Sequence, residues 1–267
     1  MPEILQYTFM QKAFIVGLLV GGLCPSIGIF LVLRRFSMVG ETLAHVSLAG
    51  VLLGILWGIS PLPFALLVSV LVVFVLEKLR SFFKNYAELS LAIIMSAGLG
   101  LAVVLMGITN ASDTSISGLL FGSIITLSNE DILMIGLLSF ISVFIIIYYY
   151  REFFLLTFDE EGARLTGIAV DRYNYLLLIL TAMVIAIGLR IVGALLVSSL
   201  MVVPVATSLL LSRGFKQTLL YAVIFGILAV LVGLIASFYL GLAPGGAIVL
   251  SSVILFLILL LGKKIRP

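Results

Sequence analysis

The chain has 267 residues, of which 63% are hydrophobic and only 10% are charged, and its net charge is +3. Soluble domains are usually about 45–50% apolar and about 25% charged, so this composition excludes an ordinary soluble protein and predicts a membrane protein. The small positive charge is no sign of nucleic-acid binding, because the basic residues lie at the ends of apolar stretches.

Nine apolar stretches are long enough to cross a bilayer, since a transmembrane helix needs about 20 apolar residues. In chain order they are 12–33, 40–58, 62–80, 88–108, 130–150, 173–189, 191–212, 217–239 and 245–262. A tight turn near Arg190 separates the sixth from the seventh. The shorter stretch 116–127 predicts a re-entrant or interfacial helix. We therefore expect an all-α polytopic membrane protein with about eight or nine transmembrane helices, forming one domain over residues 1–267.

The basic residues give the chain an orientation in the membrane. If the N-terminus lies outside and the C-terminus inside, all of the 15 Lys and Arg residues except Lys12 and Arg190 fall in inner segments. Inner loops of membrane proteins are enriched in Lys and Arg. The asymmetry therefore supports the number of crossings as well as the orientation.

The outer segment 109–131 carries three acids, Asp113, Glu130 and Asp131, and no basic residue. One interpretation is a vestibule that attracts cations. The other is an ordinary loop with acids near a helix start, where the helix dipole favours negative charge. We favour the second, because it needs only ordinary helix capping.

The second apolar stretch contains Glu41 and His45, the only histidine of the chain. Ionisable groups at membrane depth are costly and usually face a bundle interior or a water-filled path. Because they are four residues apart, the two side chains share one face of a helix, with Thr42 and Ser47 near the same polar zone. A carboxylate and an imidazole suit a divalent transition metal.

Other interpretations of Glu41 and His45 are open. The two residues could form a buried hydrogen-bonded pair that fixes helix packing, or a proton relay. Two ligands are too few for a structural zinc, which takes four, so we expect no permanently bound cofactor. They fit a passage site for a transported ion, completed by a second copy of the chain. Cys24 offers a soft sulfur atom, but a buried cysteine is more typical of packing.

The longest inner segment, 151–172, predicts a short amphipathic helix. Thr157 or Asp159 can serve as its N-cap, acidic residues fill its first turn, and Arg164 lies late, where it complements the helix dipole. Gly167 is a natural stop. Such a helix either lies on the membrane surface or forms a docking element for a cytoplasmic partner.

The chain lacks the sequence motifs of an enzyme. It contains no GxxxxGK[ST] phosphate loop, and no HExxH or GxSxG motif. A single histidine excludes a multi-histidine metalloenzyme site. We expect a transport subunit that is not itself an enzyme, with any ATP hydrolysis on a separate chain.

Several segments resemble the permeases of metal-importing ABC transporters, the zinc and manganese permeases. Residues 40–50 (Gly-Glu-Thr-Leu-Ala-His-Val-Ser-Leu-Ala-Gly) resemble that family's acid-x-x-x-His signature on the second span. Residues 158–168 (Phe-Asp-Glu-Glu-Gly-Ala-Arg-Leu-Thr-Gly-Ile) resemble its coupling helix. Three further segments, 120–123, 192–206 and 244–247, are also similar, and the likeness extends from about residue 10 to residue 262.

The resemblance implies a fold similar to type II ABC importers and a homodimer of permeases in a bacterial plasma membrane. It also implies two copies of a cytoplasmic ATPase, and an extracellular lipoprotein or periplasmic protein that delivers the ion. On this resemblance Glu41 and His45 are the metal ligands. The residues expected to couple to the ATPase are Asp159, Glu160, Glu161, Ala163, Arg164 and Gly167. We expect the small Ala163 to lie on the exposed docking face.

The motif around His45 also bears on the transported ion. Thr-Leu-Ala-His-x-Ser resembles the zinc branch of the family, whereas the manganese branch more often has proline where Ala49 stands. The expected function is therefore the permease of a zinc importer. A manganese permease, a proton-coupled secondary transporter and a structural membrane subunit are the alternatives.

Overall fold

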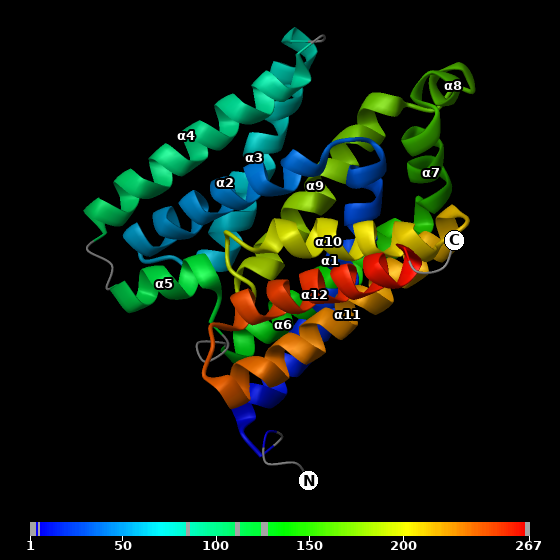
Figure 1. Cartoon of the computed structure of the whole chain (residues 1–267). Coiled ribbons are helices and arrows are strands. Elements are labelled where there is room, and N and C mark those ends of the chain that lie inside the picture. The colour runs from blue at the N-terminus through cyan, green and yellow to red at the C-terminus, as the bar shows by residue number, and fades with distance from the viewer. Residues whose placement is uncertain (1–3, 5, 84–85, 110–112, 124–127, 265–267) are drawn as a thin grey trace.

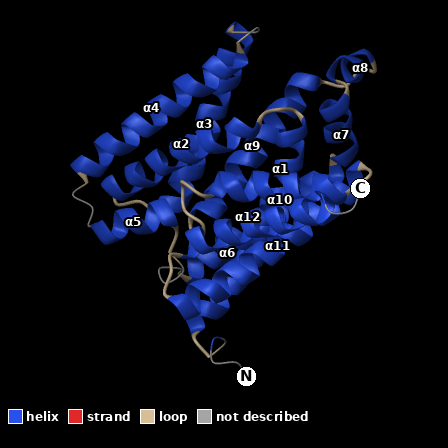
Figure 2. Ribbon diagram, in the orientation of Figure 1, coloured by secondary structure: helices blue, strands red, loops and turns tan. Residues whose placement is uncertain are grey.

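The computed structural model describes residues 4, 6–83, 86–109, 113–123 and 128–264, and its regular structure in these ranges is entirely helical (Figures 1 and 2). The helices are α1 (Thr8–Leu33), α2 (Ser37–Leu56), α3 (Pro61–Phe82), α4 (Ala87–Ile108), α5 (Asp113–Phe121), α6 (Asn129–Tyr148), α7 (Tyr150–Phe158), α8 (Glu160–Leu165), α9 (Val170–Leu189), α10 (Val197–Leu211), α11 (Phe215–Leu240) and α12 (Pro244–Lys264). The all-α prediction is confirmed.

Eight helices of the described chain are long and apolar enough to cross a membrane: α1, α2, α3, α4, α6, α9, α11 and α12. They coincide with eight of the nine predicted stretches. The spanning part of α2 is 78% buried inside the chain, against 28% for α3, α4, α6 and α12. The helix that carries Glu41 and His45 therefore lies within the bundle rather than at its lipid-facing edge.

The seventh predicted stretch, 191–212, is only partly helical. Its helix, α10, has 15 residues and is about 22 Å long, shorter than the hydrocarbon core of about 30 Å. The preceding residues 190–196 form turns, and 191–194 are buried in the protein. Non-helical backbone is tolerated at membrane depth when protein covers it. In place of the tight turn predicted near Arg190, the structure thus has a longer, mostly buried segment that leads into α10.

Three glycines explain why the chain leaves the helical path before α10. Gly122 and Gly193 have positive φ angles of 82° and 88°, and a Cβ at either residue would collide with backbone atoms of the other's segment. A Cβ at Gly245, at the start of α12, would collide with both segments. The Ala194 amide donates a hydrogen bond to the Leu119 carbonyl at 3.1 Å. We call this backbone contact between Gly122, Gly193 and Gly245 the glycine junction.

The short helix predicted at 116–127 is shifted along the chain. The structure has α5 over Asp113–Phe121, and residues 124–127 lie outside the described part of the chain. The end of α5 enters the glycine junction with the segment before α10 and the start of α12. Three segments that carried the family resemblance therefore meet at one place.

Side-chain contacts join several of the predicted inner segments to one another at one end of the bundle. Arg34, after α1, pairs with Glu160 of α8, and Phe158, at the end of α7, contacts Phe215 at the start of α11. The glycine junction joins outer segments instead. In Figure 1 the N-terminus lies at the bottom, whereas the C-terminus lies at the right, below α7. If α10 and the segment before it make a seventh crossing, the chain crosses nine times and its termini lie on opposite sides of the membrane, which is the arrangement that the basic residues predict.

Candidate functional site

Glu41 and His45 lie one turn apart on α2, as predicted, but they differ in exposure. Glu41 is exposed, whereas His45 is only 8% exposed. Glu41 lines a pocket of about 240 Å³ between α2 and α10. The other lining residues are Ser37, Met38, Ser198, Ser199, Val202 and Val203. The pocket thus combines one carboxylate with hydroxyl groups from both helices.

Sequence reasoning missed the α10 side of this pocket. A Cβ added to Gly40 would lie 3.8 Å from the Cβ of Ser198, so the two helices touch here and bring Ser198 and Ser199 beside Glu41. The only signal in the sequence was two adjacent serines in an apolar stretch. Which helix faces them depends on contacts between residues about 160 positions apart, which no local pattern reveals.

His45 has an unused ligand atom. Its Nδ1 is buried and has no hydrogen-bond partner among the described residues. The alternative of a buried, hydrogen-bonded Glu41–His45 pair is therefore wrong, because Glu41 is exposed and His45 Nδ1 is unpaired. Thr42 is not the missing partner of His45 Nδ1, since its hydroxyl donates to the Met38 carbonyl at 2.9 Å. A buried polar atom without a partner is unfavourable unless something else binds it.

The described residues of a single chain do not form a complete metal site by themselves. No group of three or more His, Cys, Asp or Glu side chains in the described ranges is arranged to hold a metal ion. Cys24 is buried, packs near Gly188 and does not line the Glu41 pocket. The side chain of Asp113 lies outside the described residues.

The inner segment folds as two short helices, α7 and α8, rather than as one. Asp159 is the N-cap of α8 and accepts a hydrogen bond from the Gly162 amide at 2.8 Å. Thr157 instead donates to the Phe153 carbonyl at 2.7 Å within α7. Of the two predicted caps, Asp159 is therefore the one that begins α8.

The other end of α8 is closed at Gly167, as predicted. Gly167 has a φ of 85°, a conformation that glycine adopts without strain. The amides of Gly167 and Ile168 donate to the carbonyls of Arg164 and Ala163 at 3.2 and 3.1 Å, which is a Schellman motif. A six-residue helix is thereby capped at both ends.

The predicted coupling residues of α8 do not all point outward. Ala163 is only 3% exposed and packs with Leu156 and Val170, so the apolar side of α8 rests on α7 and α9. The expectation that Ala163 lies on an exposed docking face is wrong for this reason. Leu165, by contrast, is 89% exposed, and Glu161 is exposed beside it.

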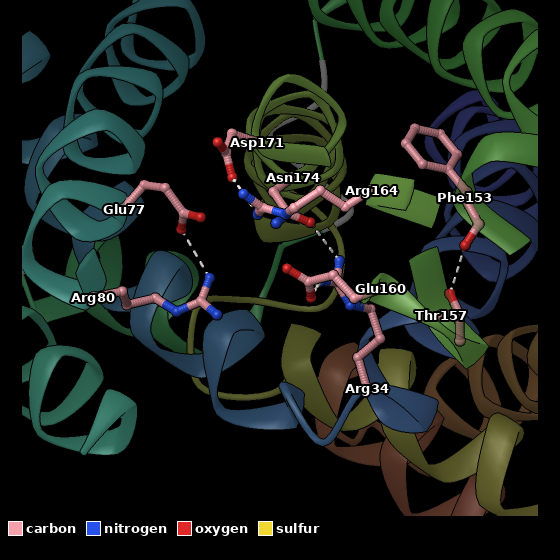
Figure 3. A network of polar contacts seen from close by, with 9 residues as sticks. All are labelled: Arg34, Glu77, Arg80, Phe153, Thr157, Glu160, Arg164, Asp171 and Asn174. Atoms are coloured by element: carbon pink, nitrogen blue, oxygen red, sulfur yellow. Dashed lines mark hydrogen bonds and ion pairs between the residues drawn. The ribbon is translucent and has the colours of Figure 1, made fainter. Parts of the chain in front are cut away.

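Two charged residues of α8 are engaged within the chain (Figure 3). Glu160 forms an ion pair with Arg34 at 2.9 Å. Arg164 pairs with Asp171 at 3.1 Å, and both side chains are largely exposed, so this second pair contributes about 0–1 kcal/mol. Glu160 is therefore tied to the turn after α1, which was not visible from the sequence.

The outer acids behave as ordinary capping residues where the structure describes them. Asp131 forms a capping box with Ser128, whose side chain accepts from the Asp131 amide at 3.0 Å. It also pairs with Arg190 at 3.1 Å. Glu130 is exposed in the first turn of α6. For Asp131, the capping interpretation is confirmed.

Comparison with known proteins adds independent findings. The sequence matches the ABC 3 transport family over residues 6–263. A probable metal transport system membrane protein of Treponema pallidum is 41% identical, with 96% of each chain covered. A manganese transport system membrane protein of Listeria monocytogenes is 30% identical, over 96% of this chain and 91% of the relative. A high-affinity zinc uptake system membrane protein of Haemophilus influenzae is 29% identical, over 97% and 99% respectively.

A solved structure shares the fold. PsaBC from Streptococcus pneumoniae in complex with Fab matches with a TM-score of 0.86 and 26% identity, over 96% of this chain and 92% of that chain. Together with the eight apolar helices, these matches establish a multi-pass membrane protein. The family match over residues 6–263 and the relative that is 41% identical show that the chain belongs to the ABC 3 transport family.

Proposed function

We propose that the chain is the membrane-spanning permease of an ATP-driven importer of divalent metal ions, with zinc as its cargo. The observation that carries this proposal is the pair on α2. Glu41 lines a pocket, and one turn away His45 holds a buried Nδ1 with no partner in the described chain. A carboxylate and a free imidazole nitrogen on a central helix suit the binding of a passing transition-metal ion.

The chemistry of the ligands favours zinc over manganese. Imidazole nitrogen is a common zinc ligand, whereas manganese is better suited by carboxylate, carbonyl and water oxygens. Relatives named for either ion show nearly equal identity, 29% and 30%, so the preference rests on His45. We therefore expect the protein to transport zinc in preference to manganese.

A second copy of the chain completes the proposed site. Two-fold pairing brings equivalent surfaces together, and Glu41 is exposed on the single chain. Two Glu41–His45 pairs supply four ligands, the number that zinc usually takes in proteins. Because each copy contributes only two, the ion is held only while the two copies are suitably placed.

A cytoplasmic ATPase is the proposed partner at α8, and an extracellular binding protein is the proposed source of the ion. Leu165 is 89% exposed and Phe158 is 60% exposed, so the tip formed by α7 and α8 presents apolar side chains at the inner end. A capped helix of this kind fits a groove, where its apolar side chains give affinity and its charges set the register.

Leu165→Asp is expected to weaken binding of the ATPase by roughly 10- to 100-fold, because a fully buried leucine side chain contributes about 1.5–3 kcal/mol. The measurement is affinity for the purified ATPase in detergent or nanodiscs. Phe82→Asp is the matched control, since Phe82 is 80% exposed at the inner end of α3. Weakened binding in Phe82→Asp alone would place the docking surface elsewhere.

Reconstitution tests the function itself. Liposomes that contain the chain with its ATPase should accumulate zinc when ATP is supplied, whereas liposomes with the chain alone should not, even under a proton gradient. The second condition decides between the two transporter classes. Zinc movement driven by protons without the ATPase would establish the secondary transporter instead.

A further inference from the structure

Arg34 lies where the turn after α1 meets α8 and α9. Its Nη2 donates to Glu160 Oε2 at 2.9 Å, and its Nη1 donates to Asn174 Oδ1 at 2.8 Å. Figure 3 shows the guanidinium between these two partners. The Arg34 side chain is only 6% exposed, whereas that of Glu160 is 44% exposed. A buried guanidinium thus bridges α8 and α9.

The turn that carries Arg34 is short and tightly closed. The amides of Arg35 and Phe36 donate to the carbonyls of Val32 and Leu31 at 3.0 and 2.7 Å, which closes α1 by a Schellman motif. Arg35 has a φ of 60°, the only positive φ of a non-glycine residue in the described ranges. Such a conformation persists only where its surroundings fix it, so the turn is expected to move as one piece.

This turn leads directly into α2. Phe36 is the N-cap residue of α2, and two guanidinium groups contact its ring, with Arg34 at 5.0 Å and Arg80 at 4.2 Å from the ring centroid. Arg80 is held in turn by Glu77 at 2.8 Å. These cation–π contacts link the N-cap residue of α2 both to Arg34 and to Arg80 of α3.

The link between Arg34 and Glu160 resists separation. Burial lowers the pKa of Arg34, and the nearby Glu160 carboxylate opposes that effect. Removing one partner of a buried charge leaves the other without compensation. A displacement of α8 is therefore expected to move Arg34 with it. The Arg164–Asp171 pair also joins α8 to α9. Because this pair is exposed, it contributes little free energy and resists separation only weakly.

We propose that Arg34 is a positioning residue that transmits movement of α8 to α2, and so to Glu41 and His45. The inference rests on the proposed function, because the ATPase supplies the movement of α8. The path runs from Glu160 through Arg34 to Phe36, and Glu41 follows on the second turn of α2.

The test follows α2 directly rather than through transport. Met38 is 43% exposed and lines the Glu41 pocket, and Cys24, the only native cysteine, is buried. Met38→Cys therefore provides one accessible thiol. The chain is assembled with its ATPase in nanodiscs, and the rate at which a maleimide labels this thiol is measured with and without ATP. Binding of the ATPase is measured in parallel.

Glu160→Gln removes the carboxylate charge that pairs with Arg34. Arg34→Lys keeps the positive charge but loses the planar guanidinium, which reaches Glu160 and Asn174 at once. Both should still bind the ATPase, while the ATP-dependent change in labelling falls at least about fivefold, the lower end of typical coupling between sites. Asp171→Asn, which breaks only the exposed pair, should behave as the unsubstituted chain. Reversing both charges, Arg34→Glu with Glu160→Arg, should restore part of the change.

Three results would overturn the proposal that Arg34 transmits movement of α8 to α2. One is an undiminished ATP-dependent change in Glu160→Gln and Arg34→Lys. Another is loss of ATPase binding in these variants, which would make Glu160 a docking contact. The third is an equal loss in Asp171→Asn. Failure of the proposed function is distinguishable, because the unsubstituted chain would then show no ATP-dependent labelling at all.

Discussion

Replacing His45 with alanine should lower zinc uptake at least about 100-fold, because loss of even an outer partner of a metal ligand reduces affinity or activity 10- to 100-fold. The substitution removes the buried Nδ1 that has no partner in the described chain, from both copies of a dimer at once. Uptake of radioactive zinc by cells, and growth in limiting zinc, measure the effect.

Thr42→Val is the matched control for His45→Ala. Thr42 is fully buried on the same helix, and its hydroxyl is already bonded to the Met38 carbonyl. Its loss removes a polar group without removing a free ligand, so uptake should stay near normal. Both variants should reach the membrane in equal amounts. Normal growth of His45→Ala in limiting zinc would refute the passage site.

Gly193→Ala should strongly destabilise the fold. Gly193 has a φ of 88°, and a Cβ there would strike the Leu120 carbonyl and the Gly122 amide nitrogen. Backbone strain contributes about 1–3 kcal/mol and overpacking a further 1–3 kcal/mol, so the free energy of unfolding should fall by about 2–6 kcal/mol. The yield of monodisperse protein and its melting temperature in detergent report the change.

Gly100→Ala shows whether the effect of Gly193→Ala is specific. Gly100 lies inside α4, and a Cβ there meets nothing within 4 Å. Alanine favours a helix over glycine by about 1 kcal/mol, so this variant should be as stable as the unsubstituted chain or slightly more so. Equal melting temperatures for the two variants would mean that the glycine junction does not limit stability.

Features set by local physics were predictable from the sequence. The length of the apolar stretches located eight helices. Capping chemistry located the two ends of α8, at Asp159 and Gly167. Each of these signals is contained within a single helix and its ends. The spacing of Glu41 and His45 likewise placed both on one face of α2, although it did not reveal that only Glu41 would be exposed.

Features set by contacts between distant segments were not predictable. In a helix that is apolar on every side, as most of these are, the sequence does not indicate which face meets protein and which meets lipid. For this reason the approach of Ser198 to Gly40 was missed. The inward direction of Ala163 and the contact between Glu160 and Arg34 depend on how α8 rests on its neighbours, and no pattern within residues 158–168 encodes that.

The glycine junction also constrains how the chain is made. Ribosomes deliver spans to the membrane one after another, and a helix of 15 residues is too short to be released into lipid alone. The backbone before α10 finds partners in α5, synthesised some 70 residues earlier, and at Gly245, synthesised some 50 residues later. The final packing of this segment is therefore expected to be completed only once α12 has been made. A chain truncated before residue 244 would lack the Gly245 contact, so the segment before α10 is expected to be less stably held in that chain.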